Sequence, residues 1–221
     1  MRIEKKAING SPFIGVFASV TEKIALLPKT ISARELRGIE ELLEVEAIQA
    51  SIADSDLIGI LAKGNSKGFI VPEIIEEGEL RELEGNGVKI KVIQGINALG
   101  NLIALNDFGG IMSPLMPEGL VQDIKRFFGI EFIRTLIANT EIAGSCIVAS
   151  NKGFVVHPNV TQKEFNLIKK ALKVKGTTST ANYGNPFIAN DVIANSKGAL
   201  IGEQTSPHEM LRIDEGLSGE E

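Results

Sequence analysis

The chain has 221 residues, of which 43% are hydrophobic and 23% are charged, proportions that are typical of a folded globular protein and exclude a disordered one. Its 23 lysines and arginines are outnumbered by 28 acidic residues, which gives a net charge of −5. A protein that binds nucleic acid mainly through phosphates needs a basic surface, so this class is excluded and any contact with nucleic acid must be local. The length suits one or two domains.

The sequence shows neither a membrane-spanning segment nor a signal peptide. No run of 18 apolar residues occurs, and residues 1–6 are charged and lack the apolar stretch of a signal peptide. Cys146 is the single cysteine, which excludes an intrachain disulfide and a cysteine-cage metal site. Because only His157 and His208 could add imidazole ligands, we expect a cytoplasmic protein that holds no metal and no cofactor.

One pattern recurs five times along the chain: a short apolar strand that ends in alanine, a polar turn and a second apolar strand. The alanines are 44, 42, 45 and 45 residues apart and are Ala18, Ala62, Ala104, Ala149 and Ala194. Turns such as residues 65–68 and 150–153 favour β-hairpins, because their Asn and Gly residues tolerate left-handed backbone. A repeat that covers almost the whole chain determines the fold.

A helical pattern follows each hairpin. Ser32 is a suitable N-cap for a helix over residues 33–45, and Thr161 with Glu164 three residues later predicts a capping box. The expected helices comprise residues 33–45, 79–83, 118–128, the segment after Thr161, and residues 207–213. Third strands are expected at residues 47–50, 88–93 and 132–138. The unit is therefore strand–strand–helix–strand, about 44 residues long.

Five such units can form either an open solenoid or a closed ring. A solenoid needs polar terminal repeats, whereas the first and fifth units are as apolar as the middle three. We therefore expect a closed ring with few free sheet edges, with five helices outside and the five alanines facing inward. The fold class is α/β, with one domain over residues 1–217 and a short acidic tail over residues 218–221.

The motifs of the chain resemble those of the archaeal translation initiation factor 6 family. They are Ala-Ser-Ile-Ala at 50–53, Gly-Asn-Ser-Lys-Gly-Phe-Ile-Val-Pro at 64–72, Ala-Leu-Gly-Asn at 98–101, Gly-Ser-Cys at 144–146, Ser-Asn-Lys-Gly at 150–153, Val-His-Pro at 156–158 and Gly-Thr at 176–177. Their joint order and spacing span all five repeats. The resemblance implies the pentein fold, a five-bladed pseudosymmetric α/β propeller.

The resemblance also implies a function and a partner. Members of the family bind the large (50S) ribosomal subunit and sterically prevent its association with the small (30S) subunit. Their contacts lie on ribosomal protein L14, with an L24-type protein and the rRNA of the sarcin–ricin loop nearby. The resemblance implies no cofactor and no catalysed reaction, so we expect a protein that is not an enzyme. We also expect a monomer.

We expect the contact surface at one end of the ring. The strand-start end, where the first strand of each unit begins, offers Gly15, Ile60, Asn101, Ser145 and Asp191. The resemblance marks Gly15 and Asn101 as contact positions, although Asn101 could also be a turn residue and Gly15 a steric requirement. The hairpin end offers Asn65, Asn106 and three lysines, Lys67, Lys152 and Lys197. These lysines could approach rRNA phosphates or simply keep the turns solvated, and we favour the strand-start end.

Two other functions remain open from the sequence. Pentein enzymes that modify guanidines use a Cys nucleophile with a His, and Cys146 and His157 suggest such a pair. Cys146, however, falls in the apolar run 143–149, where a thiol is usually buried and inert. The ring could also be a repeat scaffold for another protein partner, which would share the fold and differ in the partner alone.

Overall fold

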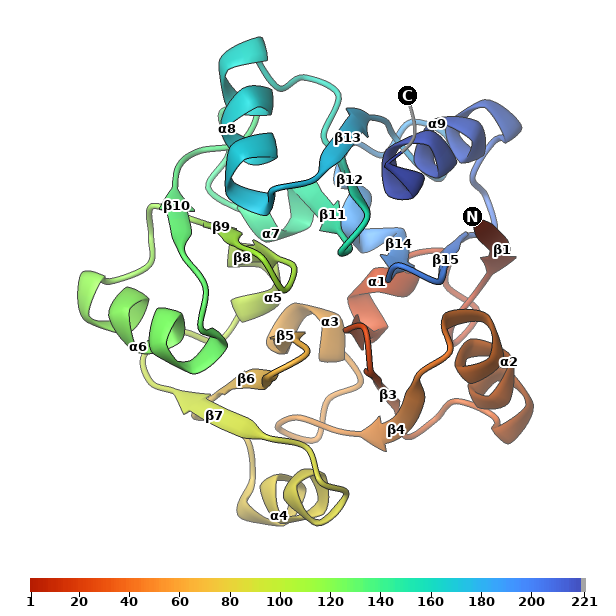
Figure 1. Ribbon diagram of the computed structural model, residues 1–221. Helices are drawn as coiled ribbons and strands as arrows, with labels where there is room; N and C mark the ends of the chain where they lie inside the picture. Colours follow the sequence, from red (N-terminus) through yellow and green to blue (C-terminus); the bar gives the residue numbers. More distant parts are fainter. Residues whose placement is uncertain (220–221) are drawn as a thin grey trace.

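In the computed structural model, which describes residues 1–219, five blades surround one central axis (Figure 1). Each blade is a three-stranded sheet with one helix on its outer side. The first blade contains β2 (Ser19–Val20), β3 (Ile24–Pro28), α2 (Ala33–Leu43) and β4 (Glu46–Ala50). The second contains β5 (Lys63–Asn65), β6 (Gly68–Pro72), α4 (Glu77–Gly85) and β7 (Ile90–Ile93). The third contains β8 (Ile103–Leu105), β9 (Gly110–Met112), α6 (Glu118–Phe128) and β10 (Phe132–Arg134).

The last two blades follow the same plan, and the fifth takes its third strand from the start of the chain. The fourth blade contains β11 (Ile147–Ala149), β12 (Gly153–Val156), α8 (Gln162–Leu172) and β13 (Lys175–Thr178). The fifth contains β14 (Val192–Ala194), β15 (Gly198–Gly202), α9 (Pro207–Ser218) and β1 (Arg2–Lys6). In every blade the first two strands pair antiparallel and the third pairs in parallel with the second.

The ring is closed by strand pairing between the two ends of the chain. β1 lies parallel to β15 over the whole register from Arg2 opposite Gly198 to Lys6 opposite Gly202. This arrangement confirms the expected five-bladed α/β propeller and excludes an open solenoid. Residues 220–221 of the expected acidic tail lie outside the described residues, and Ser218, where we expected the tail to begin, is the last residue of α9.

The outer helices match the predictions best, because their signals are local. α6 has the predicted bounds, and the predicted capping box at Thr161 opens α8. α2 ends at Leu43, earlier than predicted, since Glu44 takes a left-handed conformation. α4 and α9 are longer than predicted. Both begin behind capping boxes, and α9 continues until Gly219 takes a left-handed conformation.

The expected first strands are partly wrong, because each apolar run starts with one turn of helix. These inner helices are α1 (Ile14–Phe17), α3 (Ile58–Leu61), α5 (Leu99–Leu102), α7 (Ala143–Cys146) and the 3-10 turn η1 (Ile188–Asn190). Only the residues after each turn form the first strand of the blade. A short apolar run does not distinguish a buried strand from a buried helical turn.

The five alanines that set the repeat also occupy different places. Ala18 and Ala62 directly follow their inner helices, whereas Ala104, Ala149 and Ala194 lie within the first strands. A pocket lies on the axis of the ring, and Ala18, Ala149 and Ala194 are among the residues that line this axial pocket. Ala62 and Ala104 do not line it and pack only into the cores between blades, so the expectation that all five face inward is wrong for these two.

The hydrophobic core is divided into five clusters, and each cluster joins two neighbouring blades. One cluster, for example, packs Ile70 of β6 and Ile93 of β7 against Leu99 of α5 and Phe128 of α6. The other four repeat this plan around the ring. Because each blade shares its core with both neighbours, the described chain folds as one unit rather than as separable repeats.

Candidate functional site

Four inner helices meet at the axis with a glycine against the backbone of the inner helix that precedes them around the ring. A Cβ atom at Gly15 would lie 1.9 Å from the carbonyl oxygen of Ala189. The corresponding distance is 1.8 Å from Gly59 to the Gly15 oxygen and from Gly100 to the Gly59 oxygen, and 2.0 Å from Gly144 to the Gly100 oxygen. No side chain fits in such contacts. Gly15 is therefore a steric requirement of the ring and is itself buried.

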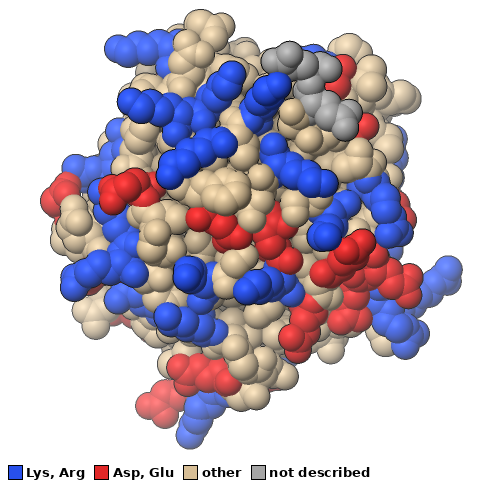
Figure 2. All heavy atoms as spheres, viewed as in Figure 1, with Lys and Arg blue, Asp and Glu red and all other residues tan. Residues whose placement is uncertain are grey.

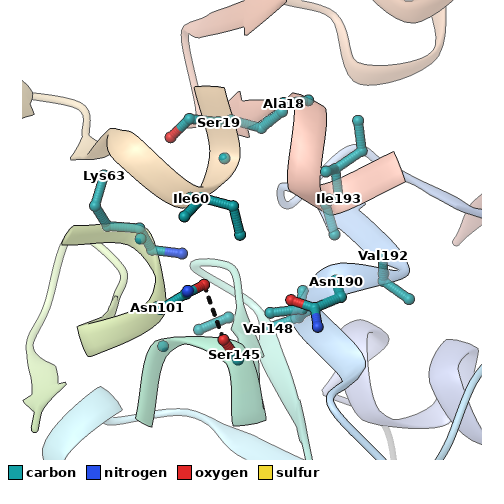
Figure 3. A pocket seen from close by; sticks show the side chains of 18 of the residues that line it. Ala18, Ser19, Ile60, Lys63, Asn101, Ser145, Val148, Asn190, Val192 and Ile193 are labelled. Carbon is teal, nitrogen blue, oxygen red and sulfur yellow. Dashed lines mark hydrogen bonds between the residues drawn. The ribbon is translucent and has the colours of Figure 1, made fainter. Parts of the chain in front are cut away.

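Four of the five inner helices place their third residue at the axial pocket. These residues are Ile60, Asn101, Ser145 and Asn190, as Figure 3 shows. The Ser145 hydroxyl donates a hydrogen bond to Asn101 Oδ1 over 3.0 Å. Ser145 is buried, whereas Ile60 and Asn101 are partly exposed. Of the predicted contact residues at this end, these last two can reach a partner directly.

Tight turns precede four of the five inner helices and surround the strand-start end. They are closed by isolated bridges at Ile8–Ser11, Ile52–Ser55, Ile137–Thr140 and Ala181–Asn185. Each contains consecutive residues with positive φ, such as Ala53 at 56° and Asp54 at 53°. L-residues rarely adopt this backbone, so something in the surrounding structure must hold these turns.

Glutamates from the outer helices hold three of these turns; Glu79 and Glu209 are buried and Glu164 is half-buried. The Glu79 carboxylate accepts hydrogen bonds from the amides of Ala53 over 2.7 Å and Asp54 over 2.9 Å, and it also accepts one from Glu76 at the start of α4. Glu164 and Glu209 act in the same way on Ala138 and Gly184. Burial opposes ionisation, but hydrogen bonds from backbone N–H groups and from nearby Ser and Thr hydroxyl groups outweigh it and lower the pKa of all three carboxyl groups. These three turns of the strand-start end are therefore held rigidly.

Large apolar side chains are exposed at this end. Phe13 and Leu57, which directly precede α1 and α3, are 44% and 42% exposed. Tyr183, in the turn before η1, is 82% exposed. Sequence analysis missed these residues, although each lies just ahead of a predicted unit and belongs to a turn. The hairpin end also has a comparable side chain, Phe108, which is 42% exposed between β8 and β9. Several exposed apolar groups on one face are typical of protein-binding surfaces.

The hairpin end has a different character. Asn65 and Asn106 are buried there, and Asn106 donates to the carbonyl oxygens of Ser150 and Leu172 over 3.0 and 2.9 Å. Their side chains complete the hairpins of the ring and do not form an outer surface, contrary to our expectation. We therefore leave both out of the proposed contact surface.

The exposed lysines of the hairpin end surround an acidic centre. Lys67, Lys152 and Lys197 are exposed. Between the hairpins, Glu22 accepts hydrogen bonds from the amides of Asn151 and Ser196, while Asp107 accepts from Ser66. Figure 2 shows the acidic atoms near the middle of this face, with lysines and arginines around them. The two signs of charge offset each other, so this end has no uniform positive field for rRNA phosphates.

Asp191 was also expected at the surface, but it is fully buried behind the turn before η1. Its carboxyl group accepts hydrogen bonds from Asn182 Nδ2 over 2.8 Å and from Asn185 Nδ2 over 2.7 Å. Burial raises the pKa of Asp191 to about 7. The group positions a turn and is not available to a partner.

Cys146 and His157 do not form a catalytic pair. The Cys146 thiol is fully buried, its Sγ lies 3.4 Å from Thr140 Oγ1, and burial raises its pKa. Buried His157 accepts a hydrogen bond from the Asn159 amide at Nδ1 and packs edge-on against Phe187. Burial lowers the pKa of His157. A reactive cysteine needs access and a stabilised thiolate, and Cys146 has neither.

The described residues were also surveyed for metal sites and membrane spans. Within residues 1–219, no cluster of three or more His, Cys, Asp or Glu side chains has the geometry to hold a metal ion. In the same range no helix has the length and apolar character to cross a membrane.

Known proteins with similar sequences share one description. The model of the eIF-6 family matches residues 3–216. Translation initiation factor 6 of Staphylothermus marinus is 37% identical over 224 residues and aligns over 99% of both chains. The protein of the same name from Methanocaldococcus jannaschii is 36% identical, over 97% of this chain and 97% of its own. The one from Thermoplasma acidophilum is 35% identical, over 98% of this chain and 100% of its own.

Similarity to one solved structure is much weaker. A DDAH mutant from Pseudomonas aeruginosa, complexed with citrulline, gives a TM-score of 0.45 at 16% identity. The match covers 94% of this chain and 73% of the other.

Proposed function

This chain belongs to the eIF-6 family, and the relatives that it matches are named translation initiation factors. We propose that it binds the large (50S) ribosomal subunit and sterically prevents the small (30S) subunit from joining. The single observation that carries the choice of surface is the exposed apolar group of Phe13 and Leu57 on the strand-start end. A steric block requires a stiff body on a shared surface, and it requires no chemical step.

The chemistry of this end favours a protein as the principal contact. Phe13, Leu57 and Tyr183 supply apolar and aromatic area, and Ile60 and Asn101 add partly exposed groups next to the axis. Aromatic residues with a few polar groups are typical of the centres of protein interfaces. We assign this surface to ribosomal protein L14, with the L24-type protein and the sarcin–ricin loop at its margin.

Cosedimentation with purified subunits tests this assignment. The double variant Phe13→Ser and Leu57→Ser removes apolar area that is already exposed, so we expect little change in thermal stability. Its affinity for the large subunit should fall by about tenfold or more, because interface anchors of this kind contribute most of the binding energy. Leu211→Ser is the matched control, since Leu211 is 57% exposed on the outer helix α9.

The control should pellet with the large subunit as the wild type does. Equal losses in the double variant and in Leu211→Ser would contradict the assignment, and so would pelleting with the small subunit. Binding of all three proteins to neither subunit would favour a scaffold for another protein partner.

A further inference from the structure

One charged side chain lies inside the axial pocket without a counterion. Lys63, the first residue of β5, extends from the wall of the ring toward Asn101 (Figure 3). The pocket is lined mainly by small and apolar residues, and Lys63 is the one charged side chain among the described residues that line it. Within residues 1–219 its ammonium group forms no ion pair with any carboxylate.

The other blades do not repeat this feature. Counted from the start of each inner helix, the positions equivalent to Lys63 are Ser19, Ala104, Val148 and Ile193. None of these four is ionisable, so the charge serves no general need of the fold. An unpaired ammonium group in the pocket costs free energy, because burial disfavours the charged form. Burial accordingly lowers the pKa of Lys63 to about 8.

Amide groups in the same pocket complete a set of donors. Asn101 accepts from Ser145 through Oδ1, which leaves its Nδ2 free to donate. Asn190 also lines the pocket, and its side chain makes no hydrogen bond to any other residue of the described chain. An ammonium and two amides, with no acidic group among the described lining residues, are complementary to an anion.

The pocket is accessible from the strand-start end. On the hairpin side it borders a second, smaller hollow, which shares five lining residues with it and is lined further on by buried Asn65, Asn106 and Asn195 and by Glu22 and Asp107. On the strand-start side Ile60, Asn101 and Asn190 are partly exposed. A ligand can therefore reach Lys63 from the surface to which the proposed function assigns the ribosomal contact.

The volume limits what can bind. The centre of a water-sized sphere can move through about 50 Å³ of the pocket, which on this measure is room for about three to five water molecules at roughly 10–15 Å³ each. Nucleotides and sugar phosphates are far too large. We propose that the axial pocket is a binding site for a small monovalent anion, a single carboxylate group or a halide, held by Lys63 with the amides of Asn101 and Asn190.

Formate and chloride are the probes for the isolated protein. Titrations followed by heteronuclear NMR of the lysine amines and by thermal melting should show saturable binding in the wild type. They should show it equally in Lys67→Met, the control, because Lys67 is exposed at the hairpin end. Lys63→Met should lose the response, and Lys63→Gln provides a second variant that keeps a polar group.

The affinity for formate should fall about tenfold between pH 7 and pH 9, as the amine loses its charge. A wild type that does not respond, or a Lys63→Met response equal to that of the wild type, would overturn the proposal. None of these measurements depends on the ribosome.

A second experiment, binding of the variants to the large subunit, identifies the source of the anion and rests on the proposed function. If a carboxylate of the ribosomal partner enters the pocket, Lys63→Met should bind the large subunit about tenfold more weakly than Lys67→Met, and formate should compete with the subunit. If the ligand is a free anion, the two variants should bind the subunit equally. Either result supports the site, provided that the NMR titration is saturable. Failure of the wild type to bind subunits would contradict the proposed function alone.

Discussion

At the scale of single residues, the glycines of the inner helices determine how closely the blades approach the axis. Gly15 was singled out in the sequence as a contact position, with a steric explanation as the alternative. The structure supports the steric explanation, because the backbone of η1 occupies the space that a side chain at Gly15 would need. A bulky replacement should therefore reduce the stability of the protein and not only its binding to a partner.

Gly15→Ala tests the steric explanation. The new Cβ would lie 1.9 Å from the Ala189 oxygen, so the helices must separate, and we expect a loss of about 3 kcal/mol in the free energy of unfolding. Gly78→Ala in α4 is the control, because nothing lies within 4 Å of its Cβ position. That change should be neutral or stabilising by about 0.5–1 kcal/mol in denaturant unfolding. If Gly15→Ala matched the control in stability yet failed to bind subunits, the contact explanation would be restored.

Residue roles were predicted from the sequence less well than the repeat itself. Asn65, Asn106 and Asp191 have the polar character of contact residues. In the folded protein, however, they are buried and form hydrogen bonds with neighbouring backbone groups or with the side-chain amide of Asn182. Phe13 and Leu57 look like core residues in the sequence. Their exposure depends on how the turns direct them, which a hydrophobic pattern does not show.

At the scale of elements, the outer helices also organise the turns of the strand-start end. Glu79 joins the start of α4 to the turn that precedes α3, and Glu164 and Glu209 repeat this connection in the fourth and fifth blades. Of these features, only the capping box of Glu164 was predicted from the sequence. The turns were not, and residues 135–138 were expected in a strand that ends at Arg134. The connection between glutamate and turn depends on the distance between two elements that are separated by a hairpin, which the sequence does not show.

Glu79→Gln tests this connection through its pH dependence. The folded protein lowers the pKa of Glu79, so the carboxylate stabilises the fold above the pKa of the unfolded chain, and this contribution is lost as the pH falls through the folded value. At pH 7 we expect the variant to lose about 1–2 kcal/mol of unfolding free energy. Below about pH 3 the difference from the wild type should shrink, because both carry a neutral group.

Glu84→Gln is the control for this series, because Glu84 is exposed on the same helix. Its unfolding curve should follow that of the wild type across the pH range. A Glu79→Gln variant with the same loss at pH 3 as at pH 7 would show that packing, and not the charge, connects α4 to the turn.

At the scale of the whole molecule, closure of the ring follows from the sequence for a simple reason. A terminal unit without a polar outer surface must pack against another unit on both of its sides. The first and fifth units can do so only by packing against each other, which closes the ring. The structure achieves this through β1 and β15 and through cores that are shared by neighbouring blades. The axial pocket could not be predicted, because Lys63 lies within a hairpin motif whose polar residues look solvated.

A ring of this kind has two unlike ends, and its proposed role requires only one of them. The strand-start end presents apolar groups, and glutamates of the outer helices hold the turn that precedes Leu57 and the turn that contains Tyr183. The hairpin end mixes lysines with a central acidic pair. A rigid body that attaches by one end can cover the surface that another particle needs.

The most direct measurement is a subunit-joining assay, in which large and small subunits are mixed with and without the protein and the joined particles are separated on a density gradient. We expect stoichiometric wild-type protein to reduce the joined fraction and to migrate with the free large subunit on the gradient. The double variant of Phe13 and Leu57 should leave joining unaffected. Undiminished joining while the wild type remains bound to the large subunit would contradict a steric block.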